Sequence, residues 1–374
     1  MNLHKKTAGI LSMQKEVNYG SFLQAYALKQ LLLHNGIDEV YFIDIIPGKQ
    51  LPGFERKKIE KGLLAFVKRV LYVLFSGKLV TKIKDRNFTR KYTKNIVSSY
   101  PVLGLDKEPL KEIDIVIIGS DEVFNCCQVT DWGYTTQLYG DIPEIKQIIS
   151  YAGSFGHTTY EQLLDYNIDQ EIGKTMKKMS AISVRDQNSC QIVEKITGIK
   201  PEVHLDPVLI YGYENEIAVS KTQYPEPYVI IYSYPKRIND KNEIKEMVTF
   251  AKSKNLKLVS IFCRHDWCDK LAIPDTPIDV LAWFKGAQYV ITDTFHGSVF
   301  SIITKRNFCT IIRNGNSQKI TSLLQTLNLE DRIITSQAIA VTLDKSIHYS
   351  PICDIIEREK QQATAYLRKQ CSKN

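Results

Sequence analysis

The chain has 374 residues, of which 44% are hydrophobic and 24% are charged, and its formal net charge at pH 7 is +8. This composition excludes a largely disordered chain, and the length favours two domains over one. The positive charge favours anionic partners such as phosphorylated small molecules or anionic lipid. Nucleic acid is not expected, because the basic residues form no recognisable binding module.

The cysteines and the start of the chain bear on where the protein works. Neither the adjacent pair Cys126 and Cys127 nor the pair Cys263 and Cys268 has the spacing of a zinc site. The first residues lead into a strand-like run without the apolar region of a signal peptide, and no apolar stretch is long enough to cross a bilayer. We therefore expect a reduced cytoplasmic protein with no metal and no cofactor.

The chain opens with strand, helix and strand. Residues 7–13 form a short apolar run, and Ser21 can cap a helix with apolar residues at helical spacing. Residues 35–36, Asn-Gly, end that helix, and residues 39–46 form the next predicted strand. This pattern is typical of the start of an α/β domain.

Residues 50–110 interrupt the alternation. Within them, residues 63–74 carry an apolar stripe at helical spacing, and the surrounding lysines and arginines continue as far as Lys91. A basic amphipathic segment of this kind is suited to lie on an anionic membrane surface without spanning it. The alternative is a helix that packs on its own domain and leaves a solvated basic face.

The alternation of strands and helices resumes after this insertion, which predicts parallel sheets with ligands at the carboxyl ends of the strands. We expect domains at residues 1–210 and 228–350, a linker at 211–227, and a C-terminal helix within 351–374 that could cross back to the first domain. The predicted strands are residues 113–118, 148–151, 181–184, 203–206, 228–232, 256–262, 288–292 and 308–312.

Four segments at predicted strand ends carry polar and small residues suited to chemistry. They are residues 18–20, 118–125, 182–186 together with 205–209, and 290–301. In this order they resemble the polysaccharide pyruvyl transferase family, and the run Thr-Asp-Thr-Phe-His-Gly-Ser at 292–298 is the most specific of them. Two positions depart from the family's usual pattern: Phe124 stands where tryptophan is usual, and Lys319 stands where arginine is more common.

The resemblance implies an α/β fold of two Rossmann-like domains facing each other across a cleft, the GT-B arrangement. It implies an enzyme that moves the pyruvyl group of phosphoenolpyruvate onto two hydroxyls of a sugar in a cell-envelope or capsular polysaccharide precursor. A cyclic ketal would form and phosphate would be released. The implied partners are phosphoenolpyruvate, a lipid-linked or polymeric sugar acceptor, and the anionic inner face of the cell membrane.

Two other classes of function remain open. A GT-B glycosyltransferase that uses a sugar nucleotide would share the fold, and fold alone does not separate the two activities. A non-catalytic envelope-assembly protein could use the basic amphipathic segment without performing chemistry.

The turn between the predicted strand 288–292 and the following helix is the main candidate for catalysis. Free backbone amides and the positive end of the helix would face a ligand there, with Gly297 allowing an anion close to the backbone and Ser298 opening the helix. His296 is a candidate catalytic acid or base, because histidine exchanges protons near neutral pH. The alternative is a structural histidine.

Three cations are candidates for the carboxylate and phosphate of phosphoenolpyruvate. Arg185 ends a predicted strand, and the planar fork of an arginine binds either anion through two hydrogen bonds. Lys319 and Arg313 follow the histidine helix and could hold the departing phosphate. The alternatives are an ion pair with an acidic residue for Arg185 and a solvated surface for the others. Asp206 and Pro207 are interpreted as a structural strand end and turn.

The first half of the chain supplies candidates for the cleft and for acceptor binding. Asp121 ends a predicted strand and could take a proton from a sugar hydroxyl or hydrogen-bond the sugar. One alternative is that Asp121 and the adjacent Glu122 form a metal site for a sugar nucleotide, and another is that Ser120 or Asp121 caps a helix. Asn125 follows about one turn later. Asn18 and Gly20 are expected to shape the cleft from the N-terminal loop.

Overall fold

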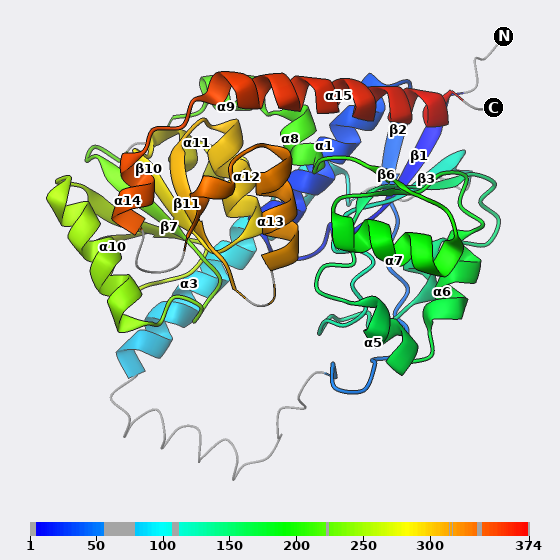
Figure 1. Ribbon diagram of the computed structural model, residues 1–374, viewed down its shortest axis with the longest axis horizontal. Helices are drawn as coiled ribbons and strands as arrows, with labels where there is room; N and C mark the ends of the chain where they lie inside the picture. Colours follow the sequence, from blue (N-terminus) through cyan, green and yellow to red (C-terminus); the bar gives the residue numbers. More distant parts are fainter. Residues whose placement is uncertain are drawn as a thin grey trace.

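The computed structural model describes residues 5–55, 79–106, 112–221, 224–313, 315, 317–334 and 339–372. Within these residues the chain forms two α/β domains, each built on a six-stranded sheet. All pairings between neighbouring strands are parallel. Parallel strands need helical crossovers, which explains why helices pack around both sheets (Figure 1).

The first sheet has the strand order β2-β1-β3-β4-β5-β6. The order reverses between β1 and β3, and ligands of parallel sheets bind at the carboxyl ends of the strands beside such a switch point. Every residue of β1, β3 and β4 is buried, as expected for strands covered on both faces. The strands are β1 (Thr7–Leu11), β2 (Glu39–Phe42), β3 (Ile115–Asp121), β4 (Ile148–Gly153), β5 (Ser183–Val184) and β6 (Glu202–Val203).

The second sheet has the order β12-β11-β10-β7-β8-β9, which is the doubly wound order of a dinucleotide-binding fold. Its switch point lies between β7 and β10. The sequence did not indicate the short edge strands β9 and β12. The strands are β7 (Tyr228–Tyr232), β8 (Lys257–Ile261), β9 (Lys270–Ala272), β10 (Tyr289–Thr292), β11 (Asn307–Ile311) and β12 (Ile333–Ile334).

Sixteen described helices, including two short 3₁₀ helices, lie between and around the strands. Their bounds are α1 (Tyr19–His34), α3 (Leu79–Val97), α4 (Tyr100–Leu103), η1 (Thr136–Tyr139), α5 (Tyr160–Asp165), α6 (Asp169–Met176), α7 (Gln187–Thr197), α8 (Pro207–Tyr211), α9 (Glu214–Val219), α10 (Lys241–Ser253), α11 (Val280–Gly286), α12 (Phe295–Ile303), α13 (Ser317–Thr326), η2 (Glu330–Arg332), α14 (Ile339–Asp344) and α15 (Tyr349–Cys371). The helix α1 is capped by Asn18, whose side chain accepts a hydrogen bond from the amide of Gly20. The predicted cap, Ser21, lies inside the first turn instead.

The helix α3 belongs to the insertion between β2 and β3, yet it packs against the second domain. The Tyr92 ring contacts the Phe262 ring at a centroid distance of 6.0 Å, and Asn95 donates a hydrogen bond to the carbonyl of Pro274 at 2.9 Å. The predicted amphipathic helix at residues 63–74 lies outside the described residues. Among the described residues, no helix combines the length and the apolar character needed to cross a membrane.

The C-terminal helix α15 returns from the second domain to the first, along one side of both domains (Figure 1). The hydroxyl of Tyr366 donates to the carbonyl of Ser150 in β4 at 2.8 Å, and Gln147 donates to the carbonyl of Gln370 at 2.8 Å. This helix joins the two domains a second time, so the two sheets are held with their carboxyl ends facing one cleft.

Candidate active site

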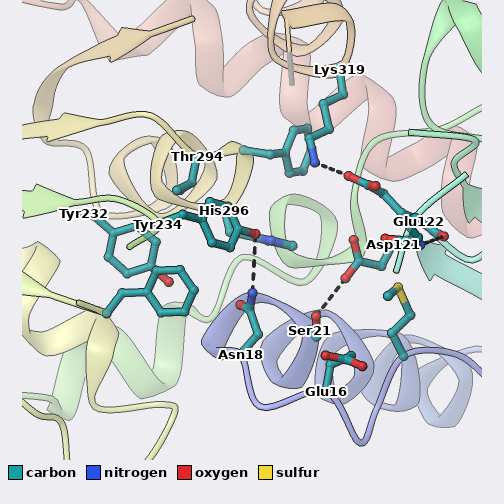
Figure 2. A pocket seen from close by; sticks show the side chains of 14 residues that line it. Glu16, Asn18, Ser21, Asp121, Glu122, Tyr232, Tyr234, Thr294, His296 and Lys319 are labelled. Carbon is teal, nitrogen blue, oxygen red and sulfur yellow. Dashed lines mark hydrogen bonds and ion pairs between the residues drawn. The ribbon is translucent and has the colours of Figure 1, made fainter. Parts of the chain in front are cut away.

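A polar pocket of about 200 Å³ lies between the carboxyl ends of the two sheets. The loop after β1 and the end of β3 form one wall, and the ends of β7 and β10 form the other, so the two switch points face each other (Figure 2). The lining residues are Met13, Glu16, Asn18, Ser21, Asp121, Glu122, Gln128, Tyr232, Tyr234, Phe262, Thr294, Phe295, His296 and Lys319.

His296 lines this pocket as the second residue of α12, which begins at Phe295 and not at Ser298 as predicted, so His296 lies in the first turn of the helix and not in a turn before it. The residue is 8% exposed, and Nε2 has no hydrogen-bond partner among the described residues. Nε2 lies 3.7 Å from Oδ2 of Asp206. Burial lowers the pKa of His296, and the carboxylates of Asp206 and Asp121 offset part of that effect. The imidazole is therefore neutral near pH 7 and able to accept a proton.

Gly297 and Ser298 lie in the first turn of α12 and do not line the pocket. The amide of Gly297 donates to the side chain of Thr294, the N-cap of α12, at 2.9 Å. A Cβ on Gly297 would overlap the Thr292 side chain, so the glycine allows α12 to begin close to β10. Ser298 is fully buried, and its hydroxyl donates to the Thr294 carbonyl at 3.2 Å. These positions do not support the predicted contact of either residue with an anion.

Arg185 lies directly behind the pocket wall. Its Nη1 donates to Oδ2 of Asp206 at 2.7 Å, and its guanidinium lies 4.2 Å from the centroid of the Phe295 ring. Nη2 is 3.7 Å from Oδ1 of Asp121. The side chain is buried and is not among the lining residues. Asp121 and Phe295 line the pocket in front of it, so the structure does not support the predicted direct contact between Arg185 and a ligand.

Asp206 has a larger part in the site than the structural turn expected from the sequence. Its Oδ1 caps α8 by accepting from the amide of Val208 at 3.0 Å. Its Oδ2 accepts from Arg185 and lies near Nε2 of His296, so one fully buried carboxylate connects the arginine and the histidine. Sequence patterns do not indicate this role, because the three residues come together only in the tertiary structure.

Lys319, on α13 of the second domain, forms an ion pair with Glu122 at the end of β3 in the first domain. Burial alone would raise the pKa of Glu122, but Lys319 and a hydrogen bond from Asn125 at 2.6 Å together lower the pKa to about 2. This ion pair crosses the pocket between the domains. Glu122 was not predicted as a site residue, and Asn125 supports it from outside the pocket lining.

Asp121 and Ser120 have different surroundings although they are neighbours. The carboxylate of Asp121 lines the pocket and accepts from the hydroxyl of Ser21 at 2.9 Å. The hydroxyl of Ser120 is buried in the first domain and donates to Oε1 of Gln24 at 2.7 Å. The position of Ser120 therefore does not support a predicted role in the cleft, whereas Asp121 could contact a ligand.

The two residues predicted to shape the cleft from the N-terminal loop have different positions. Asn18 lines the pocket, with Nδ2 at 3.5 Å from the hydroxyl of Tyr234 on the opposite wall (Figure 2). Gly20 lies against the ring of His296, where a Cβ would overlap the imidazole. Asn18 is therefore part of the pocket wall, whereas Gly20 belongs to α1, does not line the pocket and leaves room for the His296 ring.

Arg313 and Phe124 lie away from the pocket. Nη1 and Nη2 of Arg313 donate to the two carboxylate oxygens of Glu243 at 2.8 and 2.7 Å, and Arg313 is not a lining residue. Its position does not support the predicted binding of phosphate. Phe124 is buried in the first domain against Tyr139 and Phe155, so it offers no face for stacking with a ligand.

Two Rossmann-like domains with a pocket between facing switch points define a protein of the GT-B class. The family model for polysaccharide pyruvyl transferase matches residues 18–315, which include Asp121, Arg185 and His296. The chain belongs to the polysaccharide pyruvyl transferase family. No curated protein sequence matches it significantly.

Several solved structures are similar in fold. The UDP-GlcNAc 2-epimerase of Methanocaldococcus jannaschii is 11% identical, with a TM-score of 0.45, and the match covers 94% of this chain and 99% of that chain. A UDP-glucosyltransferase from Polygonum tinctorium is 10% identical, with a TM-score of 0.46, and the match covers 100% of both chains. At these identities the similarity bears on neither substrate nor mechanism.

Proposed function

We propose that this protein transfers the pyruvyl group of phosphoenolpyruvate to two hydroxyls of a sugar in a cell-envelope polysaccharide precursor. Family membership supports a pyruvyl transferase. The observation that carries the proposal is the position of His296 and Lys319 in one pocket, facing the carboxylates of Asp121 and Glu122 (Figure 2). Such a pocket brings together a group that transfers protons, a cation for an anionic donor, and acceptors for sugar hydroxyls.

The donor would bind at the end of the pocket formed by α12 and α13. Phosphoenolpyruvate is small, and the pocket volume of about 200 Å³ is below the 300–1,000 Å³ of sites for drug-sized ligands. Lys319 supplies a point charge for phosphate, and the first two amides of α12 have no acceptors within the helix. The phosphate would compete with Glu122 for Lys319.

The first chemical step would be addition of a sugar hydroxyl across the double bond of the donor. The hydroxyl oxygen bonds to the carbon that carries the phosphate, and the methylene carbon gains a proton to become a methyl group. Neutral His296 accepts the hydroxyl proton and returns it to the methylene carbon, so the step needs no other proton source. The product is a tetrahedral intermediate that still carries phosphate.

The second step would exchange phosphate for the second hydroxyl of the sugar. The bond from carbon to the phosphate oxygen breaks, the second hydroxyl oxygen bonds to that carbon, and its proton leaves with the phosphate. The cyclic ketal is then complete. Negative charge builds on the leaving phosphate, so the preorganised cation Lys319 should stabilise this step. Arg185 acts from behind the wall by holding Asp206 and Phe295 in place.

Calorimetric titration tests the donor directly. The unmodified protein should bind phosphoenolpyruvate, and Lys319→Met, which keeps most of the apolar stem, should bind it at least about tenfold more weakly because a charged hydrogen bond is lost. UDP and GDP serve as comparison ligands. Binding of either nucleotide without binding of phosphoenolpyruvate would favour a sugar-nucleotide glycosyltransferase and contradict the proposal.

We also propose that the protein works at an anionic membrane surface, as enzymes acting on lipid-linked sugars must. Support comes from the part of α3 between Leu79 and Lys91, where most side chains are exposed and apolar and basic residues occur together. A well-placed basic residue near such a surface contributes about 1 kcal/mol. The exposed side chains in this part of α3 are the apolar Leu79, Val80 and Ile83 and the basic Lys82, Lys84, Arg86, Arg90 and Lys91.

Sedimentation with liposomes tests this location. The unmodified protein should sediment with anionic vesicles at low salt and be released at high salt, because salt screens exposed charges. The double variant Lys84→Glu with Arg86→Glu should lose this binding. Lys174→Glu with Lys177→Glu, in and directly after α6 of the first domain, makes the same change in net charge and should retain the binding. Equal recovery of all three proteins in the supernatant would contradict the proposal.

A further inference from the structure

The pocket has a second half that the proposed donor chemistry does not use. Figure 2 shows Tyr232 and Tyr234 on the side of His296 opposite to Asp121 and Glu122. Phe262 completes this wall: its ring stacks on Tyr232 at a centroid distance of 5.3 Å and meets Tyr234 edge-on at 5.0 Å. We refer to Tyr232, Tyr234 and Phe262 as the aromatic wall.

The hydroxyl of Tyr232 is the unusual feature of the aromatic wall. Tyr232 ends β7, is 1% exposed and lines the pocket, yet its hydroxyl has no hydrogen-bond partner among the described residues. Buried tyrosine hydroxyls usually have a partner. At the other end of the same strand, Tyr228 is equally buried and donates to the carbonyl of Trp283 at 2.7 Å. The Tyr232 hydroxyl is therefore a buried polar group without a protein partner beside the pocket, and such a group calls for a ligand or a water molecule.

The chemistry of the aromatic wall fits a neutral sugar better than the anionic donor. One face of a pyranose ring presents C–H groups that can pack on the ring of Tyr234, which is the partly exposed member of the aromatic wall, while the sugar hydroxyls point to polar partners. Asn18 adds an amide at the edge of this half, beside the hydroxyl of Tyr234. Glu16 also lines the pocket, and its carboxylate disfavours a second anion there.

We propose that the aromatic wall is the acceptor subsite, with the Tyr232 hydroxyl bonded to a hydroxyl of a bound pyranose. This proposal rests on the proposed function, because it assigns the second substrate of the same reaction. The subsite adjoins His296, which lines the same pocket between the aromatic wall and the acidic wall. A sugar seated there would have its other hydroxyls near the group that takes their proton.

The experiment compares three full-length proteins: the unmodified chain, Tyr232→Phe, and the matched control Tyr228→Phe. Each is titrated with methyl glucopyranoside, methyl galactopyranoside and methyl mannopyranoside, with binding followed by saturation-transfer NMR on the sugar. Affinity for phosphoenolpyruvate is measured separately by calorimetry, and thermal melts are recorded.

The unmodified protein is expected to bind at least one pyranoside, and Tyr232→Phe should bind it about 5- to 10-fold more weakly, the effect of one hydrogen bond. Its Tm should be unchanged or higher, since no protein hydrogen bond is lost. Tyr228→Phe should lower the Tm and keep the affinity for the sugar.

Equal sugar affinity in Tyr232→Phe, or no binding of any pyranoside by the unmodified protein, would overturn the acceptor subsite. A loss of sugar affinity in Tyr232→Phe without binding of phosphoenolpyruvate to any protein would support the subsite and contradict the proposed donor.

Discussion

Gly20, at the start of α1, lies directly against the imidazole ring of His296, at the start of α12. The two residues belong to different domains, and any side chain at position 20 would overlap the ring. The position of the His296 imidazole therefore depends on its contact with Gly20 of the other domain as well as on helix α12.

Replacement of Gly20 by alanine should reduce turnover about 100-fold, because a displacement of about 1 Å at a reacting group can have that effect. The overall fold should persist, as judged by circular dichroism. Gly173→Ala is the matched control: its Cβ would overlap the carbonyl of Ile196, far from the pocket, so it should lower the Tm but not the turnover of folded protein. Normal turnover in Gly20→Ala would show that the His296 position is not critical.

Asp206→Asn should lower the pKa of His296, since the Asp206 carboxylate raises it against the effects of burial and of the cations Arg185 and Lys319. If neutral His296 is the active form, the acidic limb of the profile of kcat/KM against pH should move to lower pH. The value of kcat should also fall, because Arg185 loses its charged partner. An acidic limb at the same pH as in the unmodified protein would contradict the coupling between Asp206 and His296.

Arg185→Lys should lower turnover severely, by about 100-fold, although the charge is kept. A lysine cannot lie flat on the Phe295 ring while it bonds to Asp206, so both walls of the pocket lose their support. Steady-state kinetics measure the effect, and a thermal melt checks folding. If turnover and affinity for phosphoenolpyruvate are both unchanged, Arg185 has no part in the reaction.

Glu122→Gln should remove a dependence of stability on pH. The pKa of Glu122 is lowered from 4.5 to about 2 in the folded state, so its ionised form contributes about 3 kcal/mol above the unfolded-state pKa. This contribution is lost as pH falls from about 4.5 toward 2. Urea unfolding should therefore show a large difference between the two proteins at about pH 7 and a smaller one at about pH 3. A difference that is constant with pH would contradict the ion pair with Lys319.

Much of the fold follows from local patterns in the sequence. The central strands of both sheets are continuous apolar runs, which is the signature of parallel strands buried on both faces. The succession of a strand and a helix around His296 was also predicted, but the helix begins at Phe295, capped by Thr294, which is three residues before the predicted start at Ser298. The two-residue strand β12 was missed because so short a segment carries no periodicity.

The rest of the site could not be predicted, because it depends on contacts between segments distant in sequence. Tyr232 lies in an apolar strand and cannot be told from a core residue by its sequence. Only the tertiary structure shows that it lines the pocket. Asp206 was interpreted as a turn residue, and that interpretation is incomplete, since the same carboxylate holds Arg185. Arg313 was predicted to bind phosphate, but it follows β11 and its guanidinium is paired with Glu243 of α10, which is distant in sequence.

We propose above that His296 mediates transfer of a pyruvyl group from phosphoenolpyruvate to a sugar. The direct measurement follows phosphate release and acceptor mass when the unmodified protein and His296→Gln are incubated with phosphoenolpyruvate and a set of methyl glycosides and lipid-linked sugars. We expect one phosphate to be released for each acceptor that gains the mass of pyruvic acid less one water, and neither change with folded His296→Gln. Phosphate release and the same mass gain at undiminished rate in His296→Gln, or no mass gain of this size with the unmodified protein, would contradict this proposal.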